Sequence, residues 1–204
     1  MHVRGPPCNH EPASSHRRVL AELDPSAATL LHNPSMDNRT ERSPLDAADR
    51  DRVRAFLDLA EGRGPVPVLD DAGIARLLQS ARRIAIVGAS SRPGRPSHGV
   101  MATLLAAGYE CVPVNPNEGE VLGRRAYPTL AAAVLAEGPI DIVDVFRRLE
   151  FCREHAREAV AVGARCLWLQ YGLVDWEAAR IAHDGGLAVV MDRCTAVEVR
   201  RLRS

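Results

Sequence analysis

Residues 84–97 read Ile84-Ala85-Ile86-Val87-Gly88-Ala89-Ser90-Ser91-Arg92-Pro93-Gly94-Arg95-Pro96-Ser97, and they decide the fold of this chain. Residues 84–87 are apolar at every position, which is typical of a strand buried on both faces of a parallel sheet. Gly88 permits a tight turn after that strand, and Gly94 gives the loop a second flexible point. Ser97 fits the N-cap of a helix that Gly108 ends. The stretch therefore predicts a strand, a loop and a helix in succession.

A helix that begins here directs backbone N–H groups and the positive end of its dipole toward whatever lies over the strand. Arg92 and Arg95 add full positive charges at the same place. The glycine spacing differs from the dinucleotide fingerprint G-x-G-x-x-G, so an ordinary strand-to-helix connection is the alternative interpretation. The rest of the chain favours a phosphate site over that alternative.

Composition excludes several classes of protein. The chain has 204 residues, 46% of them hydrophobic and 4% aromatic, which predicts one ordinary domain plus an extension, with an aliphatic core. The net charge is zero, so composition gives no case for nucleic acid or for an anionic membrane as a partner. All 26 basic residues are arginine, which excludes a lysine Schiff base and a lysine-dependent phosphate loop.

The five cysteines are far apart in sequence and lack metal-ligand spacing, so we expect neither a disulfide framework nor a metal site. We see no apolar run long enough to span a membrane and no secretory signal. A reducing cytoplasm is the expected location.

The chain divides at a change in composition. We expect residues 1–65 to be a largely flexible extension with one amphipathic helix near 44–61, introduced by Ser43 as cap and Pro44 at its first position. Residues 66–204 form the second domain, in which a helix capped by Asp70 leads into the strand at 84–87. Apolar strands are then expected at 111–115, 141–145, 165–169 and 187–190, with helices near 129–136 and 150–162 and one capped by Asp175. Residues 121–128 are expected to add a short edge strand.

This alternation predicts an α/β fold, a Rossmann-like doubly wound parallel sheet of about five strands flanked by helices. Ligands of such sheets bind at the carboxyl ends of the strands, where the strand order reverses. The residues that follow the predicted strands gather arginines at this edge, namely Arg92, Arg95, Arg147, Arg148 and Arg193. We therefore expect an edge suited to a polyanion. A NAD site wants an acidic residue at the end of the second strand, but Glu118 comes one place late, so NAD is disfavoured without being excluded.

Five motifs in series resemble the small bacterial CoA-binding proteins, which are similar to the CoA-binding Rossmann domain of the succinyl-CoA synthetase alpha subunit. They are residues 84–97, Pro113-Val114-Asn115-Pro116, residues 141–148, Trp168-Leu169-Gln170-Tyr171-Gly172 and Val190-Met191-Asp192-Arg193-Cys194. The resemblance covers about Leu69 to Leu202 and implies coenzyme A, or an acyl-CoA, across the point of strand-order reversal.

The resemblance also implies the residues that contact the ligand. Gly88, Ala89, Ser90 and Ser91 would contact the phosphates, with Arg95, Pro96 and Ser97 beside them. Asn115, Pro116 and Asn117 would lie near the adenosine, and Phe146, Arg147, Arg148 and Gln170 would line the groove. The synthetase's phosphohistidine domain has no counterpart in the chain, so we expect binding without catalysis and assign no catalytic residue.

Alternatives stay open. One is an NAD(P)-binding enzyme or redox sensor on the same fold, and another is a CoA-binding subunit of a larger ligase-like assembly. A homo-oligomer is equally open. Cys194 follows the last strand on the ligand edge, where it could meet the CoA thiol as a mixed disulfide, although a buried, inert thiol is the favoured interpretation. Asp144 lies inside a strand, and we expect a neighbouring backbone group or arginine to satisfy it.

Overall fold

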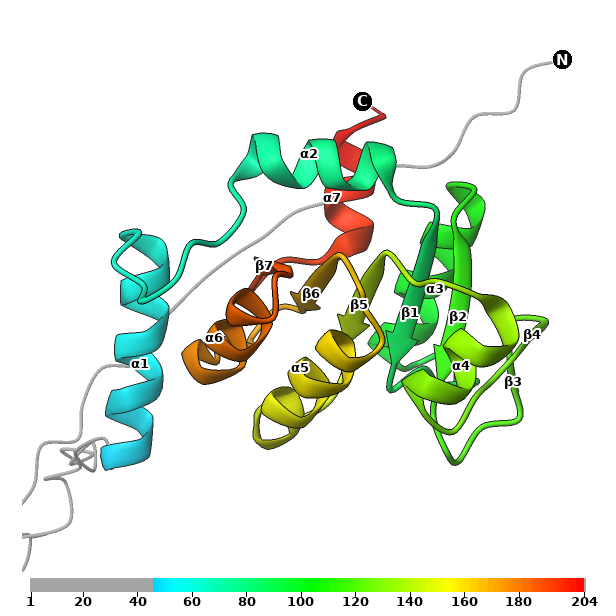
Figure 1. Ribbon diagram of the computed structural model, residues 1–204, viewed down its shortest axis with the longest axis horizontal. Helices are drawn as coiled ribbons and strands as arrows, with labels where there is room; N and C mark the ends of the chain where they lie inside the picture. The colour runs from blue at the N-terminus through cyan, green and yellow to red at the C-terminus, as the bar shows by residue number, and fades with distance from the viewer. Residues whose placement is uncertain (1–45, 204) are drawn as a thin grey trace, which may run out of the picture. The chain divides into compact units, whose positions relative to one another are not determined.

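Five parallel strands form the central sheet of the computed structural model, which describes residues 46–203 (Figure 1). They are β1 (Arg83–Val87), β2 (Glu110–Val114), β5 (Ile142–Val145), β6 (Cys166–Leu169) and β7 (Ala188–Val190). The strand order is β2-β1-β5-β6-β7, and every neighbouring pair is parallel. The predicted doubly wound parallel sheet of about five strands is therefore confirmed.

The three strands at the reversal of order end at the same level. Val87, the last residue of β1, lies opposite Val114 of β2 on one side and Val145 of β5 on the other. All three valines are buried. The loops that follow β1, β2 and β5 therefore begin together at one edge of the sheet.

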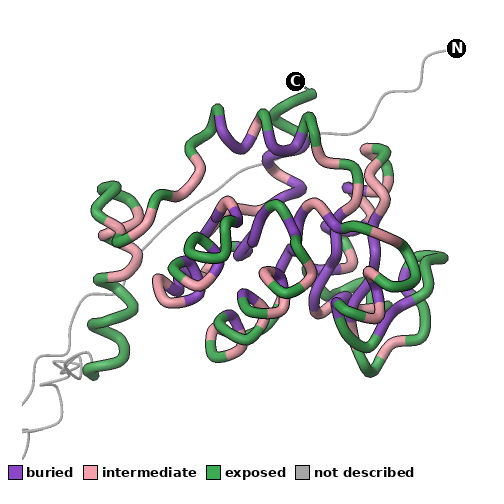
Figure 2. The backbone as a smooth tube through the Cα atoms, in the orientation of Figure 1, coloured by how far each residue is buried: buried purple, intermediate pink, exposed green. Residues whose placement is uncertain are grey.

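Helices cover both faces of the sheet. One face packs against α2 (Asp71–Ser80), α3 (Pro96–Ala106) and α7 (Thr195–Arg201), and the other against α4 (Leu130–Glu137), α5 (Cys152–Ala161) and α6 (Trp176–Asp184). Successive strand residues point to opposite faces, so each strand contributes buried side chains to the hydrophobic core on both faces of the sheet. Figure 2 shows the result: the strands and the inward sides of the helices are buried, while the outward sides are exposed.

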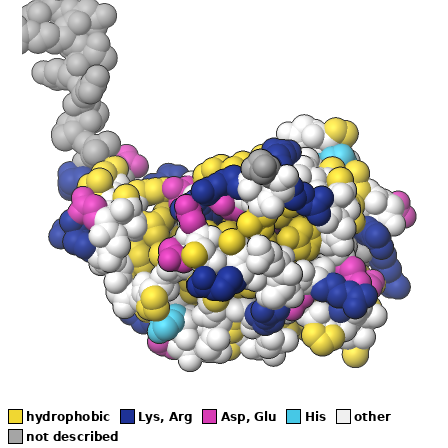
Figure 3. Space-filling view, turned by 90° about the horizontal axis from the view of Figure 1, so that it is seen from above, with side chains coloured by type: hydrophobic (Ala, Val, Ile, Leu, Met, Phe, Trp, Pro, Cys, Tyr) yellow, Lys and Arg dark blue, Asp and Glu magenta, His cyan; other side chains and the backbone are white. Residues whose placement is uncertain are grey.

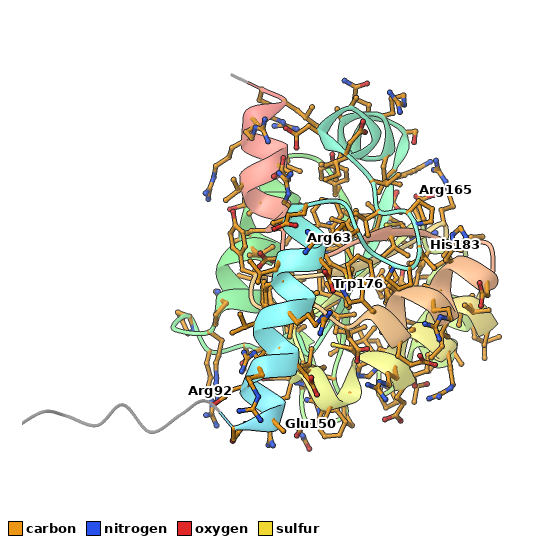
Figure 4. All side chains as sticks on the ribbon, turned by 90° about the vertical axis from the view of Figure 1, so that its left-hand side faces the viewer. Arg63, Arg92, Glu150, Arg165, Trp176 and His183 are labelled. Atoms are coloured by element: carbon orange, nitrogen blue, oxygen red, sulfur yellow. The ribbon has the colours of Figure 1, made fainter. Side chains whose placement is uncertain are left out.

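Helix α1 (Ala47–Ala60) packs beside α6. Asp46 is its N-cap, accepting a hydrogen bond from the Asp49 N–H at 2.7 Å. The expected cap and first residue, Ser43 and Pro44, lie outside the described residues. The Trp176 indole donates to the Ala55 carbonyl at 3.2 Å, and Figure 4 shows Trp176 beside α1. The boundary expected at residue 65 stays a prediction.

Four local features differ from the sequence-based expectations. Arg95, not Ser97, is the N-cap of α3, because Pro96 has the fixed φ suited to the first helical position and holds the residue before it extended. Residues 120–125 form a separate hairpin of β3 (Glu120–Val121) and β4 (Arg124–Arg125), and only Tyr127 bridges to the edge of β2. The 3₁₀ turn η1 (Leu149–Phe151) begins the predicted helix at 150, and α7 was not predicted at all.

Candidate functional site

A cavity of about 880 Å³ opens at the carboxyl edge of the sheet, above β1 and β5. The chain leaves β1 for β2 on one side and later returns to β5 on the other, so this is the point where the strand order reverses. The cavity is lined by Gly88, Ser90, Arg92, Arg95, Pro96, Ser97, Val100, Asn115, Asn117, Glu118, Phe146, Arg147, Arg148, Phe151, Gln170, Tyr171, Leu173 and Cys194.

Gly88 lets the loops after β1 and β5 touch. Its φ is +86°, in the left-handed region, and its N–H donates to the Val114 carbonyl at 2.8 Å. A Cβ at this position would lie 2.8 Å from the Phe146 carbonyl oxygen and 2.9 Å from Cδ of Arg147. Only glycine fits such a backbone without strain. The tight contact brings the loop that precedes α3 and the loop that carries Phe146 and Arg147 to one cavity wall.

Ser97 presents a polar group to the cavity from the first turn of α3. The residue is 3% exposed, and its hydroxyl makes no hydrogen bond within the described residues. Every fully enclosed side-chain nitrogen or oxygen in that part of the chain has a partner, so this hydroxyl must open onto the cavity. The Arg95 N-cap makes no side-chain capping bond, which leaves the positive end of the helix uncovered by its own side chains. The first turn of α3 is thus suited to an anion.

In the part of the chain that the structure describes, four arginines line the cavity. Arg92 and Arg95 follow β1, while Arg147 and Arg148 follow β5. The guanidinium of Arg147 lies 5.3 Å from the centre of the Phe151 ring, and Arg148 pairs with Glu150 at 3.0 Å, a highly exposed ion pair. Figure 4 shows Arg92 and Glu150 at the same edge of the molecule and Arg165, which precedes β6, at the other. The cavity is therefore positively charged although the whole chain is neutral.

Among the described residues, Glu118 is the one carboxylate that lines the cavity. Its Oε1 accepts hydrogen bonds from the Ser90 hydroxyl at 3.2 Å and from the Ser91 N–H at 3.0 Å. These bonds from Ser91 and Ser90, together with the charge of Arg92, hold the pKa of Glu118 below its ordinary value. Asn115 fastens the same loop, because its Nδ2 donates to the Ala89 carbonyl at 2.7 Å. Hydrogen bonds from the loop after β2 thus fix the conformation of the loop after β1.

Most of the residues expected at the site line this cavity. They are Gly88, Ser90, Arg95, Pro96, Ser97, Asn115, Asn117, Phe146, Arg147, Arg148 and Gln170. Three others lie beside it without lining it: Ala89 is fully buried, Ser91 donates to Glu118, and Pro116 is exposed. The structure brings the expected residues together, and their contacts with a ligand stay a prediction.

Sequence reasoning left four apolar or aromatic lining residues out. They are Val100, Phe151, Tyr171 and Leu173. Tyr171 carried a signal, since it follows Gln170 directly after β6. Val100 lies one helical turn beyond Pro96, so the helical period could have placed it on the face that carries Ser97.

Arg193 does not belong to the cationic edge, which corrects the expectation that it would. Its guanidinium is held between Glu198 at 3.0 Å and Asp71 at 2.8 Å, and Arg201 contacts the same two carboxylates. These ion pairs tie α7 to α2. Figure 3 shows the face that carries these helices, with arginine and acidic side chains next to one another.

Asp144 is fully buried in β5 and is satisfied by two side chains. Its Oδ1 accepts from Nε2 of Gln170 at 2.7 Å, and its Oδ2 accepts from the Thr195 hydroxyl at 2.8 Å. The prediction that a backbone group or an arginine satisfies Asp144 is therefore wrong. Burial raises the pKa of Asp144 to about 7, although both hydrogen bonds act in the opposite direction.

The described cysteines fall into two groups. Cys111, Cys152 and Cys166 are buried in the core, and burial raises the thiol pKa of Cys111 and of Cys152 to about 12. Cys194 is only half-buried and lines the cavity, so the favoured interpretation of a buried thiol does not describe its position. Its chemical role stays a prediction.

Within residues 46–203, no group of three or more histidine, cysteine, aspartate or glutamate side chains is placed to hold a metal ion. The helices of this part of the chain are all too short or too polar to cross a membrane.

The comparison with known proteins decides the family. A family described as CoA binding domain matches residues 82–200, which is more than half of the chain. The chain belongs to the CoA binding domain family. This confirms, over residues 82–200, the resemblance to CoA-binding proteins that was expected for about Leu69 to Leu202.

Several relatives of this CoA-binding domain are known. The uncharacterized protein YneT of Bacillus subtilis (strain 168) is 44% identical over 126 residues, 62% of this chain and 91% of that protein. A hypothetical protein from Pyrococcus horikoshii OT3 is 38% identical with a TM-score of 0.63, covering 67% of this chain and 94% of its own. A solved protein of Thermus thermophilus is 36% identical with a TM-score of 0.61, covering 66% and 99%.

Proposed function

We propose that this chain binds coenzyme A or an acyl-CoA in the cavity at the carboxyl edge of its sheet, without catalysis of its own. The observation that carries the proposal is the convergence of the first turn of α3, the open Ser97 hydroxyl and four arginines on one cavity beside Gly88. Coenzyme A carries a diphosphate and a phosphomonoester, and helix N-termini and arginines are both well suited to binding phosphate.

The position of each cavity wall suggests how the ligand lies. The diphosphate would be placed over Gly88 and Ser97, with Arg95 beside it, and the adenosine toward Asn117. A hydrogen bond to a charged group contributes about 1.5 to 3 kcal/mol, so two or three such contacts support a micromolar dissociation constant after the cost of association.

The chemistry of the lining supports binding without catalysis. Of the lining side chains, Glu118 is the candidate general base, and its lowered pKa and two hydrogen bonds make it a weak one. Cys194 is the candidate nucleophile, and among residues 46–203 no histidine lines the cavity beside it to activate the thiol. Incubation with acetyl-CoA should therefore release no free CoA above the buffer rate, as measured with a thiol reagent.

Titration calorimetry with CoA tests the binding itself. Wild-type protein should bind CoA with micromolar affinity, and Arg95→Ala should weaken binding about tenfold, because one charge-assisted contact is lost. Arg157→Ala is the matched control, since Arg157 is exposed on α5 and does not line the cavity. Absence of CoA binding by the wild-type protein would refute the proposal, and equal effects of the two variants would remove Arg95 from the site.

The NAD(P) alternative keeps one supporting observation. Glu118 lies in the cavity after β2, near the position where a dinucleotide site places its ribose-binding carboxylate. Its Oε1 is already shared between Ser90 and Ser91, which favours a role in holding the loop. The same calorimetry with NAD and NADP separates the two ligands, and tighter binding of either than of CoA would favour the alternative.

A further inference from the structure

The interior side of the cavity wall holds a closed group of three polar side chains from separate elements. Asp144 lies in β5, Gln170 follows β6 directly, and Thr195 is the first residue of α7. Nε2 of Gln170 lies 2.7 Å from Asp144 Oδ1 and 2.9 Å from Thr195 Oγ1, and Oγ1 lies 2.8 Å from Asp144 Oδ2. Asp144 and Thr195 are fully buried, while Gln170 is 6% exposed and lines the cavity.

The chemistry of these groups leaves one orientation for the Gln170 amide. An ionised carboxylate only accepts hydrogen bonds, so the single hydroxyl proton of Thr195 must go to Asp144. The Thr195 oxygen can then only accept. Both groups that face the inner end of the Gln170 amide are therefore acceptors, and only the NH₂ group, with its two protons, satisfies both. The carbonyl oxygen of Gln170 must point the other way.

The carbonyl oxygen of Gln170 faces open space. It has no hydrogen-bond partner within the described residues, and every fully enclosed polar side-chain atom in that part of the chain does have one. The oxygen is therefore accessible, and the open space beside Gln170 is the cavity. The neighbouring lining residues Tyr171, Leu173 and Cys194 carry no charge of the kind that the four arginines supply elsewhere in the cavity. This wall therefore presents a hydrogen-bond acceptor among uncharged lining side chains.

We propose that Asp144 and Thr195 are positioning residues that hold the Gln170 amide with its carbonyl toward the ligand, so that this wall selects a ligand N–H donor and disfavours an anion. The inference rests on the proposed function, and within it the donor is an amide N–H of the pantetheine arm. A phosphate or carboxylate placed here would meet a carbonyl oxygen with the buried Asp144 charge behind it, which is unfavourable on both counts.

The test compares two probes at pH 8, where Asp144 is ionised because its pKa is about 7. CoA carries the pantetheine arm, and 3′-phospho-ADP carries the same nucleotide phosphates without it. Thr195→Val removes the hydroxyl at nearly constant volume, while Thr195→Ser keeps it. We expect Thr195→Val to weaken CoA binding about five- to tenfold, because the Gln170 amide is no longer held in one orientation and its hydrogen bond to the ligand is weakened. Binding of 3′-phospho-ADP should stay within twofold of wild type. Thr195→Ser should restore CoA binding to within twofold.

The outcomes separate the two proposals. If wild-type protein binds neither probe, the proposed function fails. If it binds both and Thr195→Val changes both or neither, binding stands and the positioning role is overturned. Should Thr195→Val not fold, wild-type protein is titrated with CoA analogues in which each amide N–H in turn is replaced by an ester oxygen. At least one should bind about tenfold more weakly, and equal affinity of both analogues and CoA overturns the inference.

Discussion

Gly88→Ala should destabilise the protein and open the cavity wall, for reasons that can be given a magnitude. A Cβ at Gly88 would lie 2.8 Å from the Phe146 carbonyl oxygen, which is backbone and cannot turn aside. The left-handed φ of +86° costs a residue with a Cβ about 1 to 2 kcal/mol, and overpacking adds about 1 to 3 kcal/mol. A small gain from the less flexible unfolded chain offsets part of this, so the free energy of unfolding should fall by about 2 to 4 kcal/mol.

Urea unfolding followed by the fluorescence of the buried Trp168 measures this loss. Gly94→Ala is the matched control in the same loop, because a Cβ at Gly94 meets nothing within 4 Å and its φ is not in the left-handed region. It should change the free energy of unfolding by less than about 0.5 kcal/mol. If the two variants are equally stable, the close approach of Gly88 to Phe146 does not constrain the fold, and the reasoning is refuted.

Three further outcomes are expected. Burial raises the folded-state pKa of Asp144 to about 7, above its ordinary value of 3.8, so between these values the folded protein binds a proton that the unfolded chain has lost. As the pH rises from about 4 to about 7, the free energy of unfolding of the wild type should therefore fall relative to that of Asp144→Asn. A constant difference between the urea midpoints of the two proteins at pH 4 and pH 7 would contradict this. Iodoacetamide should label Cys194 before the other described cysteines, with CoA slowing the reaction, and mass spectrometry showing no protection would place the ligand elsewhere. Asp70→Ala should cost about 1 kcal/mol through loss of the 2.7 Å cap to Gly73, more than Asp46→Ala, because α1 buries no residue; the order of the two thermal midpoints checks it.

The sheet could be predicted from the sequence because its strands are short and mainly apolar, with Asp144 of β5 as a buried exception. Residues 84–87 and 142–145 are buried at every position. Their mainly apolar sequences therefore match their positions in the interior strands β1 and β5. The cavity followed from the same reasoning, because the residues after each strand must meet at one edge. This is why Gly88, Asn115, Phe146 and Gln170 were found without coordinates.

What could not be predicted depends on partners that are distant in sequence. Helix α7 has seven residues, and it is stabilised by ion pairs from Arg193 and Arg201 to Asp71, more than 120 positions earlier. The same ion pairs hold Arg193 away from the cavity, and a sequence position after a strand carries no sign of them. The group of Asp144, Gln170 and Thr195 spans 51 residues, and no local pattern indicates that three such side chains meet.

The bonds from Ser90 and Ser91 to Glu118 have a consequence for the timing of recognition. In a phosphate-binding loop, the anion serves as an acceptor for backbone N–H groups. Here a resident carboxylate takes that acceptor's place, so the loop is already arranged before any ligand arrives. A nucleotide bound as proposed would therefore lose little affinity to ordering the loop. In the proposed complex it would also meet a competitor for the Ser91 amide, which would leave α3, Ser97 and the arginines as the groups that hold its phosphates.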